Sequence, residues 1–131
     1  MLPLTLDTVR LSLHILAVCI WIGGQLVVAA AVPVLREVRS DAPRLVARRF
    51  GQVAWPAFGL AVVTGIWSIL TLPSGQSFEY NVTLGVKLLL VVGSGMAAFV
   101  HQQTSSSALR GATGGLGLVS ALGALVLGVM L

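Results

Sequence analysis

The sequence predicts an all-α integral membrane protein, a bundle of four transmembrane helices that forms one domain over residues 1–131. Composition is the first reason: 56% of the residues are hydrophobic and only 9% are charged, whereas soluble domains carry about 25% charged residues. The second reason is that the apolar residues fall into four long stretches. Each stretch is close to the roughly 20 residues that a helix needs to cross a bilayer core about 30 Å thick.

The spans follow from the limits of these stretches and are expected at 11–35, 50–72, 84–100 and 109–131. Asp7 is a candidate N-cap for the first helix. The segment 40–43, Ser-Asp-Ala-Pro, predicts a helix start that runs along the membrane surface before the second span. The first stretch is too long for a signal peptide, whose apolar region has about 7–15 residues, so we expect a membrane anchor.

The distribution of basic residues predicts the orientation. The formal charge is +4, but the charges are local and indicate membrane topology rather than nucleic-acid binding. Arg110 lies in the third connection, and residues 73–83 contain no Lys or Arg. The positive-inside rule places the first and third connections in the cytoplasm of a bacterial-type plasma membrane and both termini outside, with Arg10 as the exception. The first connection carries Arg36, Arg39, Arg44, Arg48 and Arg49.

His14 is the most informative residue because it lies inside the first apolar stretch. Ionisable residues at membrane depth are costly and are functional candidates by default. At 1.5 Å per residue, Lys87 is expected at a similar level in the outer half of the third span. Thr64, Ser68 and Thr71 share one face of the second span, and together these residues predict a polar pocket that opens outward.

Helix phase adds further residues to this prediction. Trp21 follows His14 by seven residues and projects from the same side of the helix. Lys87, Ser94 and His101 form a second stripe on the third span. His101 is expected about 21 Å deeper than Lys87, so His14 and His101 are not expected to bind one ion within a monomer.

Structural roles are the alternatives at each position. Lys87 can extend its ammonium group to the headgroups, and His14 can be a packing residue that makes one interhelical hydrogen bond. For His101, a solvated position at the helix end is the leading interpretation. The glycines of the fourth span, with Gly123 and Gly128 among them, predict close helix packing either within the chain or against a second copy.

The ordered motifs resemble copper resistance D-type membrane proteins. The run 13–18, Leu-His-Ile-Leu-Ala-Val, followed by Trp-Ile-Gly-Gly at 21–24, is similar to the first helix of that family. Segments 50–55 and 63–66 resemble its next helix, and 84–90, with Lys87, resembles the following one. This resemblance implies copper handling or transport at the plasma membrane, with His14 as a ligand.

The same pattern of histidine, Trp-x-Gly and lysine also resembles the haem b-binding protoporphyrinogen oxidase family. That resemblance implies a membrane redox protein in which His14 is the haem-ligand candidate and Lys87 takes the place of the embedded lysine. Trp21 and Thr64 are the further residues expected to shape the cofactor pocket.

The chemistry of the residues divides these two hypotheses. Soft Cu(I) prefers thiolate, thioether or imidazole ligands, and the outer side offers His14 with Met1 and Met130. Haem needs a protein ligand for its iron, for which His14 is the candidate. It also needs a cation to neutralise a propionate, for which Lys87 is the candidate. No nucleophile–base pair is evident, so hydrolytic catalysis is not expected. The third hypothesis is a non-catalytic accessory subunit that binds a partner or a second copy through the fourth helix.

Overall fold

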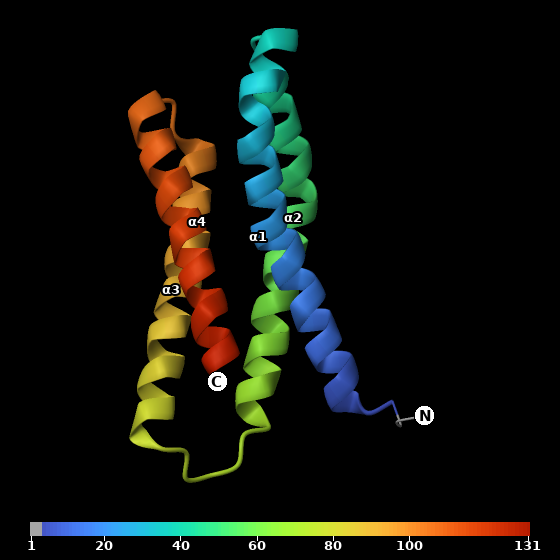
Figure 1. The fold of residues 1–131 in the computed structure, drawn as a ribbon, viewed down its shortest axis with the longest axis vertical. Coiled ribbons are helices and arrows are strands. Elements are labelled where there is room, and N and C mark those ends of the chain that lie inside the picture. The colour runs from blue at the N-terminus through green and yellow to red at the C-terminus, as the bar shows by residue number, and fades with distance from the viewer. Residues whose placement is uncertain (1–3) are drawn as a thin grey trace. The chain divides into compact units, whose positions relative to one another are not determined.

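The computed structural model describes residues 4–131, and these fold into four long helices joined by short connections (Figure 1). The helices are α1 (Leu6–Val38), α2 (Ala42–Leu70), α3 (Phe78–Gln103) and α4 (Ser107–Met130). Residues 4–131 contain no strand. By length and composition, each helix is able to cross a membrane. The prediction of an all-α, multi-pass membrane protein is therefore confirmed.

The helices associate in sequential pairs, α1 with α2 and α3 with α4. Residues up to Leu72 form the first compact unit, and residues from Pro73 onward form the second. We refer to them as the first and second hairpins and describe each by itself. That the whole chain is one domain stays a prediction.

The predicted spans lie almost entirely within the observed helices, which extend beyond them at most ends. Only Thr71, Leu72 and Leu131 fall outside the helices that contain the rest of their spans. The helices are longer because capping side chains, rather than the limits of the apolar stretches, define their first turns. Ser77 accepts a hydrogen bond from the backbone N–H of Tyr80, and Ser106 does the same for Leu109.

The N-cap of α1 is Thr5, whose side chain accepts a hydrogen bond from the backbone N–H of Thr8. The prediction that Asp7 caps this helix is wrong. Asp7 lies in the first turn, and its carboxylate pairs with Arg10 at 3.1 Å. A carboxylate in the first turn still stabilises the helix through the macrodipole.

The start of α2 is at Ala42, within the predicted segment 40–43, and the helix continues to Leu70 without interruption. Asp41 occupies the N-cap position but makes no side-chain cap hydrogen bond. Its carboxylate instead accepts two hydrogen bonds from Arg39, at 3.0 Å from Nε and 2.8 Å from Nη2. This bidentate pair closes the tight connection between α1 and α2.

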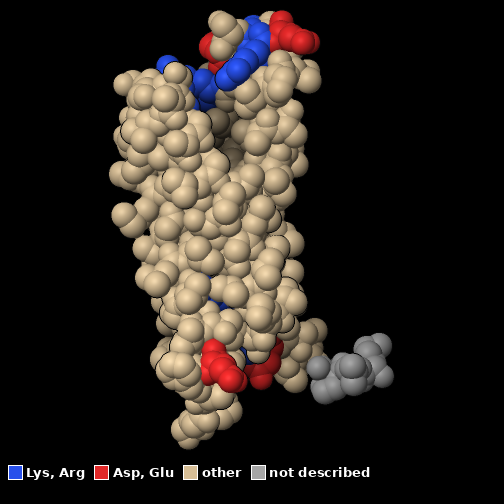
Figure 2. Space-filling view, turned by 60° about the vertical axis from the view of Figure 1, so that its left-hand side comes forward, with Lys and Arg blue, Asp and Glu red and all other residues tan. Residues whose placement is uncertain are grey.

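The surface of the helices is apolar. In the most apolar 18-residue segment of each helix, only 11% to 22% of the residues are buried inside the protein. Large side chains such as Leu89 and Val27 are exposed, which is unfavourable in water and favourable in lipid. Lys and Arg side chains gather at the end of the first hairpin that carries its connection (Figure 2). A lipid bilayer is therefore the environment that the helices fit.

Candidate metal centre

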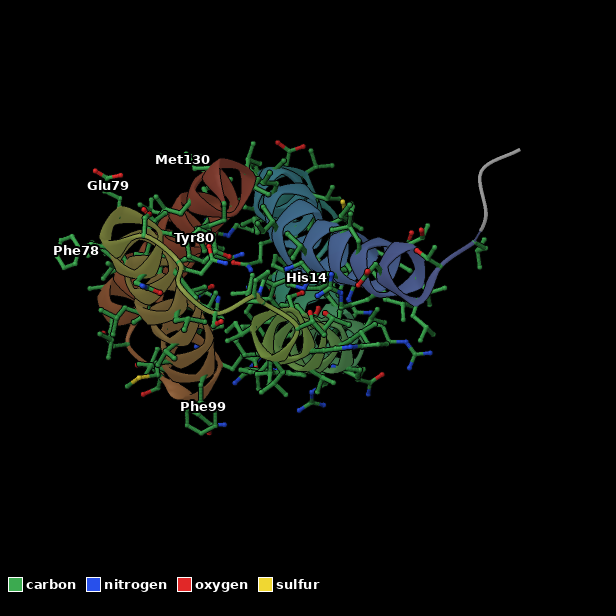
Figure 3. The ribbon with its side chains drawn as sticks, turned by 90° about the horizontal axis from the view of Figure 1, so that it is seen from below. His14, Phe78, Glu79, Tyr80, Phe99 and Met130 are labelled. Atoms are coloured by element: carbon green, nitrogen blue, oxygen red, sulfur yellow. The ribbon has the colours of Figure 1, made fainter. Side chains whose placement is uncertain are left out.

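His14 and Thr64 join the two helices of the first hairpin. His14 Nδ1 lies 2.8 Å from Thr64 Oγ1, and Figure 3 shows His14 on the side of α1 that faces α2. The imidazole is half-buried, and Thr64 is only 2% exposed. The predicted association of these two residues, 50 positions apart in the sequence, is present in the structure.

The hydrogen bonds of Thr64 define the tautomer of His14. Thr64 Oγ1 lies 2.7 Å from the carbonyl oxygen of Leu60 and 3.2 Å from that of Ala61. A carbonyl only accepts, so the single hydroxyl hydrogen of Thr64 points to its own helix backbone, a common arrangement for threonine in helices. Oγ1 then accepts the hydrogen of His14 Nδ1, which leaves the lone pair of the imidazole on Nε2.

The helix packing holds the imidazole closely. A Cβ atom at Gly65, the residue after Thr64, would lie 3.5 Å from His14 Cε1. On α1, Ala17 is fully buried one turn beyond His14. Small residues therefore let the two helices approach at the level of the histidine.

An aromatic cluster lies two turns further along the same face of α1. Trp21 is 6% exposed, and its ring centroid is 4.5 Å from that of Phe58 and 5.5 Å from that of Trp55. Trp55 and Phe58 also meet edge to face at 5.9 Å. Trp21 thus packs against α2 on the face that carries His14, and it provides an apolar boundary on the inner side of the histidine.

Arg10 lies one turn before His14 on α1, toward the N-terminus. Its Nη1 donates to Thr71 Oγ1 at 2.8 Å, and its Nη2 pairs with Asp7. Its Nε is buried and has no hydrogen-bond acceptor among residues 4–131. Two members of the predicted polar face of α2, Thr64 and Thr71, therefore meet polar side chains of α1. The third, Ser68, donates to the backbone oxygen of Thr64.

The second hairpin contains the other polar stripe. Lys87 is half-buried on α3 and makes no hydrogen bond or ion pair with any described residue. Its Nζ would lie 3.1 Å from a Cβ atom at Gly128. Ser94, two turns further, is only 1% exposed. The stripe therefore faces α4, while the predicted shared depth of Lys87 and His14 stays a prediction.

His101 lies partly exposed near the end of α3, as the leading interpretation expects, and it also contacts α4. Its Nδ1 donates to the backbone oxygen of Arg110 at 2.7 Å, and a Cβ atom at Gly114 would lie 3.1 Å from the ring. Gly123 faces Leu90, just as Gly128 faces Lys87. These glycines of α4 therefore pack within their own hairpin.

No family model, curated protein or solved structure matches this chain. The chemistry of the site must be derived from its own residues.

The described residues offer few side chains that can bind a metal. They therefore favour a metal centre that needs few protein ligands. Residues 4–131 contain no group of three His, Cys, Asp or Glu side chains able to hold a metal ion. Of the predicted thioether ligands, Met130 is exposed near the end of α4, and Met1 lies outside the described residues. Cys19, the single cysteine, is exposed. His14 is therefore the ligand around which a centre is best argued.

Arg10 is the residue of this site that the sequence prediction missed. It was treated only as an exception to the positive-inside rule. The spacing of four residues between Arg10 and His14 could have predicted that both lie on one helix face, because residues i and i+4 are neighbours there.

Proposed function

We propose that this protein is a haem b-binding membrane redox protein in which His14 is an axial ligand of the iron. The observation that carries the proposal is the contact of His14 Nδ1 with Thr64 Oγ1, whose own hydrogen points to its helix backbone. A histidine that binds a metal through Nε2 typically donates its Nδ1 hydrogen to an oxygen atom, which orients the ring and increases its basicity. Thr64 Oγ1 is that oxygen.

The donor set supports haem more than a copper ion. The four equatorial ligands of haem iron come from the porphyrin, so the protein supplies only axial ligands. A protein site for Cu(I) needs several soft ligands, and the described residues hold no cluster of three candidate side chains from His, Cys, Asp and Glu. The packed rings of Trp21, Trp55 and Phe58 keep this side of the histidine apolar.

Bound haem would supply one-electron chemistry at its iron. The residues of the first hairpin have separate roles toward it. His14 would bind the iron, and Thr64 would orient the imidazole. The aromatic cluster around Trp21 would exclude water from the side of His14 that it covers. Lys87 belongs to the second hairpin, and its role as a counter-charge to a propionate stays a prediction from the sequence.

Copper handling is the second candidate function. It is supported by the ordered resemblance of three helices and by the lone pair on His14 Nε2, since imidazole is also a copper ligand. Met1 and Met130 stay predictions from the sequence as its thioether ligands. An accessory role without a cofactor is the remaining alternative, and the packing of Gly123 and Gly128 within their own hairpin leaves it less support.

The proposed location is a bacterial-type plasma membrane. All arginines except Arg10 lie in or near the first and third connections, which would face the cytoplasm, with both termini outside. This orientation places His14 in the outer half of the bilayer. Cysteine accessibility labelling at positions 40 and 76, in a Cys19→Ser background, tests the orientation. Labelling of position 40 from the outside would contradict it.

The test of function is the absorption spectrum of the detergent-purified protein after haem-sufficient expression, together with metal analysis. We expect a Soret band in the wild type and in His101→Ala, and its loss in His14→Ala. His101 is the matched control because it is the only other histidine. Copper that is retained by the wild type and lost in His14→Ala, without a Soret band, would favour the second candidate. A wild type with neither haem nor copper contradicts both.

A further inference from the structure

The side chain of Arg10 is almost enclosed at the outer end of the first hairpin. It is 17% exposed, and two of its three nitrogens have partners, Thr71 Oγ1 at 2.8 Å and Asp7 Oδ1 at 3.1 Å. The third nitrogen, Nε, is buried without an acceptor among residues 4–131. A buried donor that is left unpaired costs free energy, and the cost is larger when the group is charged.

The local charges do not balance Arg10. Asp7 is 77% exposed, so water screens its interaction with the guanidinium. The hydroxyl of Thr71 is neutral, and its own hydrogen is directed to the backbone of α2, where Oγ1 lies 3.0 Å from the oxygen of Ser68. The environment of Nε therefore favours an additional anionic oxygen.

Arg10 and His14 are placed to act on one ligand. They are four residues apart on the same face of α1, so their backbones are about 6 Å apart along the helix axis. Both are also tied to α2, through Thr71 and Thr64 respectively. A ligand bound at His14 Nε2 that extended toward the outer surface would bring its edge to Arg10.

We propose that Arg10 is a carboxylate-binding residue that pairs, through its Nε hydrogen, with a propionate of the haem held by His14. This inference rests on the proposed function. Arginine suits the role because its planar guanidinium is always charged and matches the geometry of a carboxylate. The two propionates of haem lie on one edge of the macrocycle, so this contact would fix which edge faces outward.

The experiment compares haem b with its dimethyl ester, which lacks both carboxylates. Apoprotein from haem-deficient expression is titrated in detergent, and the Soret change gives Kd for each ligand. The variants are Arg10→Gln and, as the matched control, Arg36→Gln at the opposite end of the same helix. Thr71→Val is the structural control, since it removes the tie to α2 and leaves Arg10 in place.

We expect Arg10→Gln to weaken haem b binding about tenfold, the size of one lost hydrogen bond to a charged group. Binding of the ester is expected to be equal in the wild type and in Arg10→Gln. Arg36→Gln should match the wild type with both ligands, and Thr71→Val should keep the preference for the free acid.

Other results overturn the inference in distinguishable ways. Equal haem b affinity in the wild type and Arg10→Gln shows that Arg10 does not contact a propionate. Equal weakening of both ligands shows that Arg10 acts only through helix packing. A wild type that binds neither ligand contradicts the proposed function, and the role of Arg10 is rejected with it.

Discussion

His14 Nδ1 and Thr64 Oγ1 lie 2.8 Å apart, and the hydroxyl that accepts this hydrogen bond donates to the carbonyl oxygen of Leu60 at 2.7 Å. One threonine therefore connects the imidazole of α1 to the backbone of α2. The orientation of the ring depends on the rotamer of a side chain that is itself held by its own helix.

Thr64→Val tests this dependence. Valine keeps the shape of threonine and removes the acceptor, so the imidazole loses its orientation. We expect haem affinity to fall about 10-fold to 100-fold, as is typical for the loss of a hydrogen-bond partner behind a metal ligand. Thr64→Ser keeps the hydroxyl and should stay near the wild type. Soret titration measures both, and equal affinity of the valine variant with the wild type would show that the hydrogen bond has no role in binding.

Gly24 and Gly23 form a matched pair for helix packing. A Cβ atom at Gly24 would overlap the ring of Phe50, whereas one at Gly23 would meet nothing within 4 Å. We expect Gly24→Ala to destabilise the first hairpin by about 1–3 kcal/mol, the usual cost of overpacking. Gly23→Ala should be neutral or slightly stabilising, because alanine is the better helix former. Thermal unfolding in detergent, followed by circular dichroism, measures both. A neutral Gly24→Ala would contradict the close approach to Phe50.

Trp21 is expected to stabilise the first hairpin more than Trp67 does. It is 6% exposed and in ring contact with Trp55 and Phe58, whereas Trp67 is 37% exposed. Trp21→Ala should destabilise the protein by about 3 kcal/mol, and Trp67→Ala by much less. The same unfolding experiment distinguishes them, and similar losses for the two variants would refute the ranking.

His101 is expected to stabilise the second hairpin. Its hydrogen bond to the backbone oxygen of Arg110 joins the ends of α3 and α4. We expect His101→Ala to lower stability by about 1 kcal/mol, typical of an interhelical hydrogen bond in a membrane protein. The exposed Gln103, two residues further along α3, is the matched control. Gln103→Ala should leave the unfolding midpoint unchanged, and a midpoint equally unchanged in His101→Ala would show that the bond contributes nothing.

The four spans and several site residues could be predicted from sequence because they depend on local periodicity. Apolar length determines whether a helix can cross a membrane, and helix phase determines which residues share a face. These rules alone associated His14 with the Thr64 face and arranged Lys87, Ser94 and His101 in one stripe. The closeness of Lys87 to Gly128 and of His101 to Gly114 shows that this stripe lies against α4.

The prediction that was wrong concerns the choice of partner. Asp7 has an N-cap residue type, but Thr5 takes that position and Asp7 pairs with Arg10. The hydrogen bond from His101 to a carbonyl of α4 was not predicted, although it is compatible with a partly solvated position. Periodicity does not show how two helices are rotated and shifted against each other, and this register decides which polar groups meet. Arg10 was missed for the same reason, because its importance depends on Thr71, 61 residues away.

The length of α1 has a mechanical consequence at the arginine-rich end. Its 33 residues make a rod about 50 Å long, against a hydrocarbon core of about 30 Å. Even at the upper limit of observed tilt, near 40°, such a rod would still span about 38 Å along the bilayer normal. Part of α1 must therefore lie beyond the acyl chains, and the end that carries Arg36 and Arg39 is the one that headgroups and water solvate best. Moving these charges into the hydrocarbon would be costly, so they oppose withdrawal of α1 through the bilayer.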